Sequence, residues 1–250
     1  MTGQYCQIRS SVGQGCLFPF PRFLTAFLGL LALVCPASGN DTPDKCQSDA
    51  MIVFDASGSM GTTDYALKLP RIARVKKSME TVIPEVAPMR RLGLIVYGEG
   101  EYNDCNSIEL RMKPTAYATD PLLDIIKKIN PRGRTPLTRS VELAAEALDH
   151  KSRQSTIVLL TDGEETCGGD PCATAKRLKA EAKDLTIHVI GYREQGGYFA
   201  ARCMSDQTGG EYKAVKTEDE LIVSVTSNTW LPARHREQFC AKLFDFKHLA

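Results

Sequence analysis

The chain has 250 residues, of which 43% are hydrophobic and 24% are charged, and its formal net charge at pH 7 is +1. This length suits one large domain or two small ones, and the composition is that of a globular protein with a sizeable core. Lysine and arginine are scattered along the sequence, so neither the net charge nor its distribution indicates a nucleic-acid partner.

The first 39 residues have the pattern of a secretory signal peptide. Residues 23–35 are almost entirely apolar, Arg9 and Arg22 precede them, and small residues follow at 37–39. Basic, apolar and small-residue segments in this order are typical of a cleaved leader. We therefore expect residues 1–39 to be removed and the protein to be exported, either to a periplasm or to the medium.

Two other interpretations of the leader remain open. The first is an uncleaved membrane anchor, although the apolar run is short for a helix that spans a bilayer. The second is a lipoprotein attached through Cys35, which is disfavoured because Val34 is bulky for the position before a lipidated cysteine.

A polar linker at 40–47 precedes a domain predicted for residues 48–230. Apolar runs predict strands, and apolar residues at helical spacing predict helices. Pro70 suits a first helical turn, and Pro84 is predicted to mark the end of that helix. In chain order, the first half reads as a strand at 51–54, a helix at 70–83, a strand at 92–97, a short antiparallel edge strand at 107–111 and a helix at 120–129.

The second half continues the alternation, and Thr138 and Asp170 are placed to cap two of its helices. It reads as a helix at 139–149, a strand at 156–160, a helix at 171–183, a strand at 186–190, a helix at 198–208, a strand at 211–215 and a helix at 218–230. Strands alternating with helices imply an α/β fold with a doubly wound, mostly parallel central sheet and helices on both faces. The tail at 231–250 is expected either to pack on the domain or to bind a partner.

Six cysteines lie outside the leader, and an even number in an exported domain indicates up to three disulfides. They are Cys46, Cys105, Cys167, Cys172, Cys203 and Cys240. Cys167 and Cys172 are expected to pair with each other, or each with Cys105 or Cys203, and the sequence does not choose between these. No CxxC occurs, which disfavours a zinc site.

The most informative motif begins where the first strand ends. Asp55, Ser57 and Ser59 alternate directly after the apolar run 51–54. Alternate residues of an extended segment point the same way, so one carboxylate and two hydroxyls can converge at the tip of a buried strand. Oxygen ligands of this kind suit hard cations such as Mg²⁺.

Two later segments can complete the same oxygen set. Thr135 lies in the loop 130–137, and Asp162 follows the predicted strand 156–160. Ligand sites in open α/β sheets form at the carboxyl ends of the strands, where Asp55 and Asp162 both fall. The sequence therefore predicts a cation site that combines all three segments.

Taken together, these segments resemble the von Willebrand factor A (VWA) domain with its metal-ion-dependent adhesion site, and the resemblance covers roughly residues 48–229. The family pattern of Asp-x-Ser-x-Ser, a distant Thr and a distant Asp maps onto Asp55, Ser57, Ser59, Thr135 and Asp162. The sequence around these motifs is most similar to that of VWA proteins of the bacterial extracytoplasmic type. The resemblance also implies that the two ends of the domain meet, which would pair Cys46 with Cys240.

What the resemblance implies for function is a non-enzymatic protein that binds a protein ligand through Mg²⁺, with Mn²⁺ or Ca²⁺ possible at the same oxygens. Ser57, Ser59 and Thr135 would ligate directly, and Asp55 and Asp162 would act largely through water. Uncharged hydroxyls neutralise little of the cation's charge, so an Asp or Glu carboxylate of the partner can complete its shell.

Several alternatives compete with this interpretation. The motif around Asp55 could be a tight turn that caps a helix. A structural envelope protein with a vestigial site is a second alternative. A hydrolase built on the serines is a third, but no G-x-S-x-G elbow or phosphate-binding glycine motif occurs. Glu164 and Glu165 could tune the charge of the site or be solvated, and Tyr97 and Trp230 are expected in the core.

Overall fold

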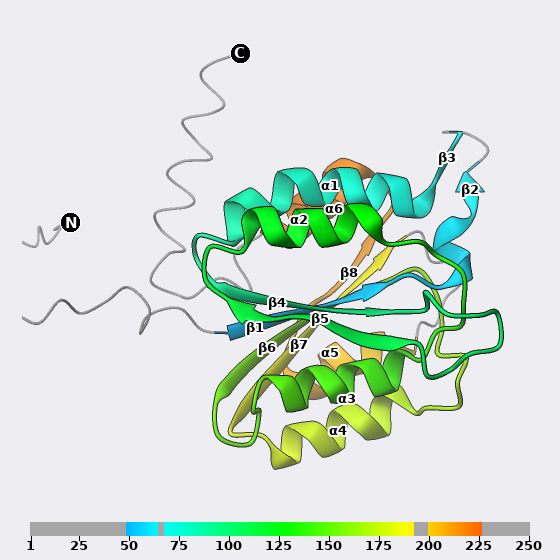
Figure 1. Ribbon diagram of the computed structural model, residues 1–250. Helices are drawn as coiled ribbons and strands as arrows, with labels where there is room; N and C mark the ends of the chain where they lie inside the picture. The colour runs from blue at the N-terminus through cyan, green and yellow to red at the C-terminus, as the bar shows by residue number, and fades with distance from the viewer. Residues whose placement is uncertain (1–48, 65–67, 193–199, 227–250) are drawn as a thin grey trace, which may run out of the picture. The chain divides into compact units, whose positions relative to one another are not determined.

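A six-stranded sheet lies between two layers of helices (Figure 1). The computed structural model describes residues 49–64, 68–192 and 200–226. The predicted leader, linker and C-terminal tail lie outside the described residues, as do Cys46, Cys240 and Trp230.

The strand order is β5-β4-β1-β6-β7-β8, and every neighbouring pair is parallel except β4 and β5. The strands are β1 (Asp49–Asp55), β4 (Arg91–Tyr97), β5 (Ile108–Thr115), β6 (Gln154–Thr161), β7 (Asp184–Tyr192) and β8 (Tyr212–Val215). The predicted doubly wound, mostly parallel sheet with an antiparallel edge strand is confirmed, and that edge strand is longer than predicted.

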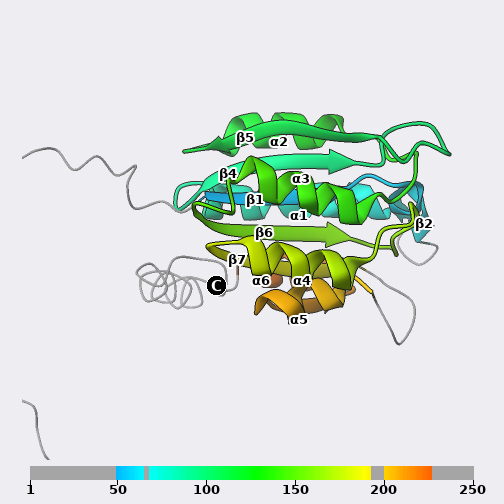
Figure 2. The same cartoon turned by 90° about the horizontal axis from the view of Figure 1, so that it is seen from below.

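Helices cover both faces of the sheet (Figure 1). On one face lie α1 (Arg71–Val86), α2 (Thr119–Lys128) and α6 (Glu218–Thr226), and on the other lie α3 (Leu137–Ala147), α4 (Pro171–Glu181) and α5 (Arg202–Thr208). Figure 2 shows the second layer from below. Because both faces are covered, the central strands must be apolar on both sides, which explains their continuous apolar runs.

Strand β1 illustrates the two-sided burial and sets up the site. All seven of its residues are buried. Ile52 and Phe54 pack into the core under α1, whereas Met51 and Val53 pack into the core under α3. The strand is central, with β4 on one side and β6 on the other, so its C-terminal Asp55 lies between the ends of two neighbouring strands.

Several helix boundaries differ from prediction, and two of them have a clear physical reason. Helix α1 runs through Pro84 to Val86 instead of ending at the proline. A proline removes one helical hydrogen bond, but the last turn is retained because Val86 is buried and Ala87 N donates to Ile83 O at 2.9 Å. Helix α3 begins at Leu137, so Thr138 lies in its first turn and is not the cap.

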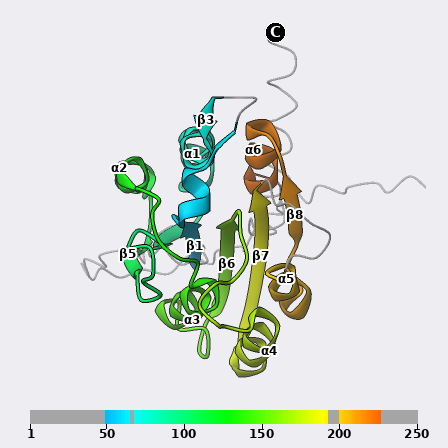
Figure 3. The same cartoon turned by 90° about the vertical axis from the view of Figure 1, so that its right-hand side faces the viewer.

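Two other helix ends follow the sequence, whereas α5 begins at Arg202 instead of residue 198. Asp170 caps α4, since its Oδ1 accepts from Ala173 N at 3.0 Å. Gly209 ends α5 in the left-handed conformation, with φ of 76°. A short ladder between β2 (Thr63–Asp64) and β3 (Leu69–Pro70) was not predicted, and it stands at the carboxyl end of the sheet (Figure 1). Figure 3 views the molecule from this end.

Candidate metal site

Four of the five predicted site residues form one hydrogen-bonded cluster at the carboxyl end of the sheet. Ser57 N donates to Asp55 Oδ1 at 2.7 Å, and the hydroxyls of Ser57 and Ser59 are 3.0 Å apart. Ser59 Oγ donates to Asp162 Oδ1 at 2.6 Å, across 103 residues of sequence. Asp55 ends β1 and Asp162 directly follows β6, and these two strands are neighbours in the sheet.

The short 3-10 helix η2 (Gly58–Gly61) follows the strand and carries Ser59. Asp55 is fully buried and Ser57 is 2% exposed, whereas Ser59 is partly exposed. The cluster therefore opens to solvent at its Ser59 side, while its anionic base is sealed in the fold.

The loop that carries Thr135 bonds to the Ser57 segment through its backbone. Ser57 and Gly133 form a parallel bridge, and Gly58 N donates to Gly133 O at 2.9 Å. Among the described residues, no hydrogen bond joins the Thr135 side chain to the other four. Thr135 is nevertheless buried, and it lies two residues after Gly133, where its segment bonds to the Ser57 segment.

Two more residues, which the sequence analysis did not single out, hold the carboxylates. Thr161 Oγ1 donates to Asp55 Oδ2 at 2.5 Å, and Arg71 Nη1 donates to Asp162 Oδ2 at 2.6 Å. Thr161 directly precedes Asp162 in the sequence. Arg71 begins α1, 91 residues away from its partner, and no local pattern connects the two.

The electrostatics of Asp55 reflect its burial. Burial and then the nearby charge of Asp162 raise the pKa of Asp55 from 3.8 to about 6, against the hydrogen bonds from Ser57 and Thr161, which lower it. Asp55 is therefore anionic at neutral pH. Burial, followed by the charge of Asp55, raises the pKa of Tyr97 well above 10, so this core phenol is neutral.

The spacing of the oxygens fits a small divalent cation. Neighbouring ligand oxygens on an octahedral Mg²⁺ lie about 3 Å apart when the metal–oxygen bonds are about 2.1 Å. The Ser57–Ser59 separation of 3.0 Å matches this. The Asp162 carboxylate lies beside these hydroxyls, 2.6 Å from Ser59 Oγ, where it could act on an ion through water. The donor set of hydroxyls and carboxylates is also the one that hard cations prefer.

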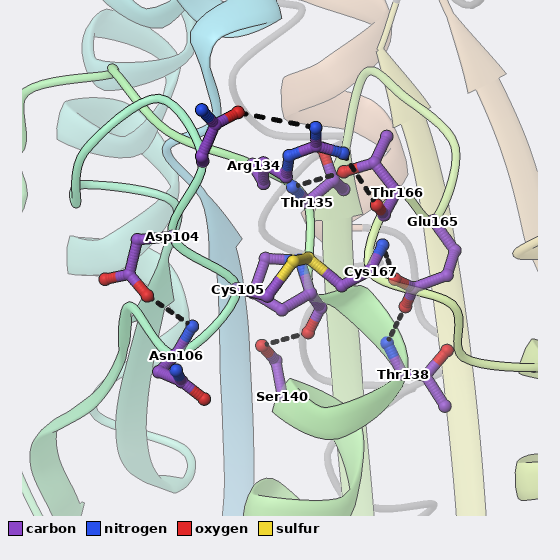
Figure 4. Close-up of a disulfide and its surroundings, with 12 residues drawn as sticks. Asp104, Cys105, Asn106, Arg134, Thr135, Thr138, Ser140, Glu165, Thr166 and Cys167 are labelled. Atoms are coloured by element: carbon purple, nitrogen blue, oxygen red, sulfur yellow. Dashed lines mark hydrogen bonds between the residues drawn. A yellow bond between two sulfur atoms is a disulfide. The ribbon is translucent and has the colours of Figure 1, made fainter.

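A disulfide between Cys105 and Cys167 supports the Thr135 side of the site (Figure 4). Thr135 N donates to Thr166 Oγ1 at 2.8 Å, and Thr166 N donates to Thr135 O at 3.1 Å. Thr166, which is next to Cys167 of this disulfide, therefore bonds to both the N–H and the carbonyl of Thr135.

Glu165 has a structural role beside the same disulfide. One of its carboxylate oxygens accepts from Thr138 N at 2.7 Å and the other from Cys167 N at 2.6 Å (Figure 4). This carboxylate satisfies an amide in the first turn of α3, where negative charge is favourable. It replaces the cap that the sequence analysis had assigned to Thr138.

The second disulfide joins Cys172 to Cys203, between α4 and α5. The two disulfides correspond to the alternative in which Cys167 and Cys172 pair with Cys105 and Cys203, respectively. Within the described part of the chain, no helix combines the length and apolar character needed to cross a membrane.

Residues 50–165 match the family model described as von Willebrand factor type A domain. All five predicted site residues lie within the matched segment. The fold, with its six-stranded mixed sheet and helices on both faces, is VWA-like.

Among curated proteins, the chain is similar to "Uncharacterized protein YwmC" of Bacillus subtilis (strain 168), with 27% identity over 204 residues that cover 77% of this chain and 88% of the relative. Among solved structures, it is similar to the von Willebrand factor type A protein from Catenulispora acidiphila, with a TM-score of 0.56, 16% identity, and coverage of 77% of this chain and 42% of that one.

A further similar structure is the PilB minor pilin from Streptococcus sanguinis, with a TM-score of 0.55 and 15% identity. The match covers 81% of this chain and 64% of the pilin. The chain thus spans less than two thirds of either solved structure, and at these identities the likeness concerns the fold.

Proposed function

We propose that this chain is an exported, non-enzymatic binding protein that captures an acidic protein ligand through a divalent cation, with Mg²⁺ as the first candidate. Asp55, Ser57, Ser59, Thr135 and Asp162 would hold the ion. The observation that carries this proposal is the row of closely spaced oxygens from Ser57, Ser59 and Asp162.

The chemistry follows from the donor types. A bound divalent cation would supply an electrophilic centre able to accept a carboxylate oxygen. The serine hydroxyls are uncharged, so they neutralise little of its charge. Thr161 and Ser57 N fix the orientation of Asp55, which reduces the reorganisation that binding would require.

Export is supported by the predicted leader and by two disulfides, which persist in oxidising compartments. One of the structures that share this fold is a minor pilin, which is compatible with a role at the cell surface. A periplasmic location remains part of the proposal.

One observation favours the alternative of a structural envelope protein with a vestigial site. Arg71 already supplies a positive charge to Asp162 at 2.6 Å. If this guanidinium replaced the ion, the cluster would be a structural ion pair and the protein would capture no ligand through metal.

Titration of the purified protein with Mn²⁺, followed by electron paramagnetic resonance and calorimetry, tests the proposal. The same oxygens accept Mn²⁺ in place of Mg²⁺. We expect one site, weakened about 10- to 100-fold in S57A and D162A, because each change removes an oxygen that holds or orients the ion. Ser152→Ala and Asp124→Ala, at exposed positions, are matched controls and should bind like the wild type.

Three outcomes contradict the proposal. Absence of Mn²⁺ binding by a folded wild-type protein would favour the structural alternative. Equal affinity in S57A, D162A and the wild type would place the ion elsewhere. A hydrolytic activity on an ester or phosphoester would make the protein an enzyme, if that activity copurified with it and were lost in S57A.

A further inference from the structure

The carboxylate of Asp162 is shared between the candidate metal site and a guanidinium. Its Oδ1 accepts from Ser59 Oγ, and its Oδ2 accepts from Arg71 Nη1, each at 2.6 Å. The Asp162 side chain is fully buried, and that of Arg71 is 18% exposed. An ion pair this buried interacts more strongly than one on the surface.

Arg71 is attached to the segment that carries the two serines. Its backbone N–H donates to Thr62 O at 3.1 Å, and Thr62 N in turn donates to Ser59 O at 3.0 Å. The ladder that pairs Thr63 with Pro70 closes the intervening excursion of the chain. The β2–β3 ladder thus brings the chain back to the site, and α1 begins there with Arg71.

The charges of these residues have opposite consequences for an ion and for an acidic ligand. Asp55 and Asp162 bring two carboxylates to the site, and the positive charge of Arg71 offsets one of them. With a dication bound, the three side chains and the ion would carry one net positive charge, whereas without Arg71 they would be neutral. Arg71 should therefore repel the ion and attract a carboxylate.

We propose that Arg71 is a specificity-determining residue that weakens cation binding and strengthens capture of a carboxylate by the loaded site. This inference rests on the proposed function, because it concerns the same cation. On this view the ion pair between Arg71 and Asp162 does not replace the cation. It lowers the affinity for the cation and raises the affinity of the loaded site for a carboxylate.

The test compares Mn²⁺ affinity at pH 7.5, with and without sodium acetate as the carboxylate probe, in R71Q, R71M, R71K and the wild type. We expect R71Q and R71M to bind Mn²⁺ about tenfold more tightly, because one nearby positive charge is lost. In the wild type, acetate should raise the apparent Mn²⁺ affinity more than acetamide does. That gain should shrink in both neutral variants and persist in R71K.

Lys77→Gln is the matched control, because it removes one positive charge from the same helix. The Lys77 side chain is 71% exposed and pairs with Glu218 instead of Asp162. This variant should keep both the Mn²⁺ affinity and the acetate effect of the wild type.

The remaining outcomes separate the two proposals. Unchanged or weaker Mn²⁺ binding in folded R71Q and R71M overturns the inference, since Arg71 would then only position Asp162. If neither neutral variant folds, Arg71 is a structural residue and the inference is wrong. If only the neutral variants bind Mn²⁺, Arg71 opposes the ion but the proposed function fails for the native chain. If no variant binds, the metal site itself is wrong.

Discussion

Gly98→Ala is expected to lower the free energy of unfolding by about 3 kcal/mol or more and to abolish cation binding. Gly98 follows β4 with φ of +85°, and a Cβ there would lie 2.6 Å from Ser57 N and 2.8 Å from Arg134 O. These are backbone atoms, so relief would require the two site segments to separate. Chemical denaturation and Mn²⁺ titration measure the two effects.

Gly98 also joins the segments by hydrogen bonds, since its carbonyl accepts from Gly133 N at 2.7 Å. Gly168→Ala is the matched control, because Gly168 has φ of +83° but an added Cβ there would meet no atom within 4 Å. It should cost about 1 kcal/mol from conformation alone and leave cation binding intact. Equal stability losses in the two variants would contradict the role given to Gly98.

The double variant C105A/C167A should lose about 4 kcal/mol of stability, because the disulfide closes a 62-residue separation. It should also bind Mn²⁺ about tenfold more weakly, since the released loop must be ordered again around Thr135 at a cost in conformational entropy. Thermal and chemical unfolding give the first quantity, and calorimetry gives the second.

The other disulfide provides an internal comparison. Cys172 and Cys203 are separated by 31 residues, and because loop entropy grows only logarithmically with length, their removal should cost a similar amount. The helices that this disulfide joins, α4 and α5, do not hold the Thr135 loop, so the C172A/C203A variant should bind the cation as tightly as the wild type does. If both double variants lost the same Mn²⁺ affinity, the loss would reflect lower overall stability and not the release of the Thr135 loop.

The central strands and the order of elements were predictable because burial on two faces leaves a continuous apolar run in the sequence. This is how residues 51–54 gave the core of β1 and how Asp55 was placed at its end. The β2–β3 ladder was missed because each of its strands has only two residues, which is too short to leave a periodic pattern in the sequence.

The residues that hold the candidate site were harder to predict than its expected ligands. A basic residue at the start of an amphipathic helix is normally solvated, and nothing near Arg71 in the sequence reveals the buried carboxylate that it contacts. Glu165 was similarly ambiguous, because its amide partners belong to a helix start and a disulfide loop. Contacts between distant segments depend on how the strands and helices are arranged in space, and the spacing of apolar residues in the sequence does not give that arrangement. The predicted pairing of Cys46 with Cys240 lies outside the described residues and stays a prediction.

The central position of β1 also bears on how the chain acquires its structure during synthesis. This strand emerges from the ribosome before both of its neighbours, and its second edge stays open until residues 154–161 have been made. An open apolar edge is prone to pair with other chains. A nascent chain of this protein therefore carries a buried-type apolar strand with one edge unpaired from residue 55 until residue 161 has been made, which makes early shielding by a chaperone advantageous.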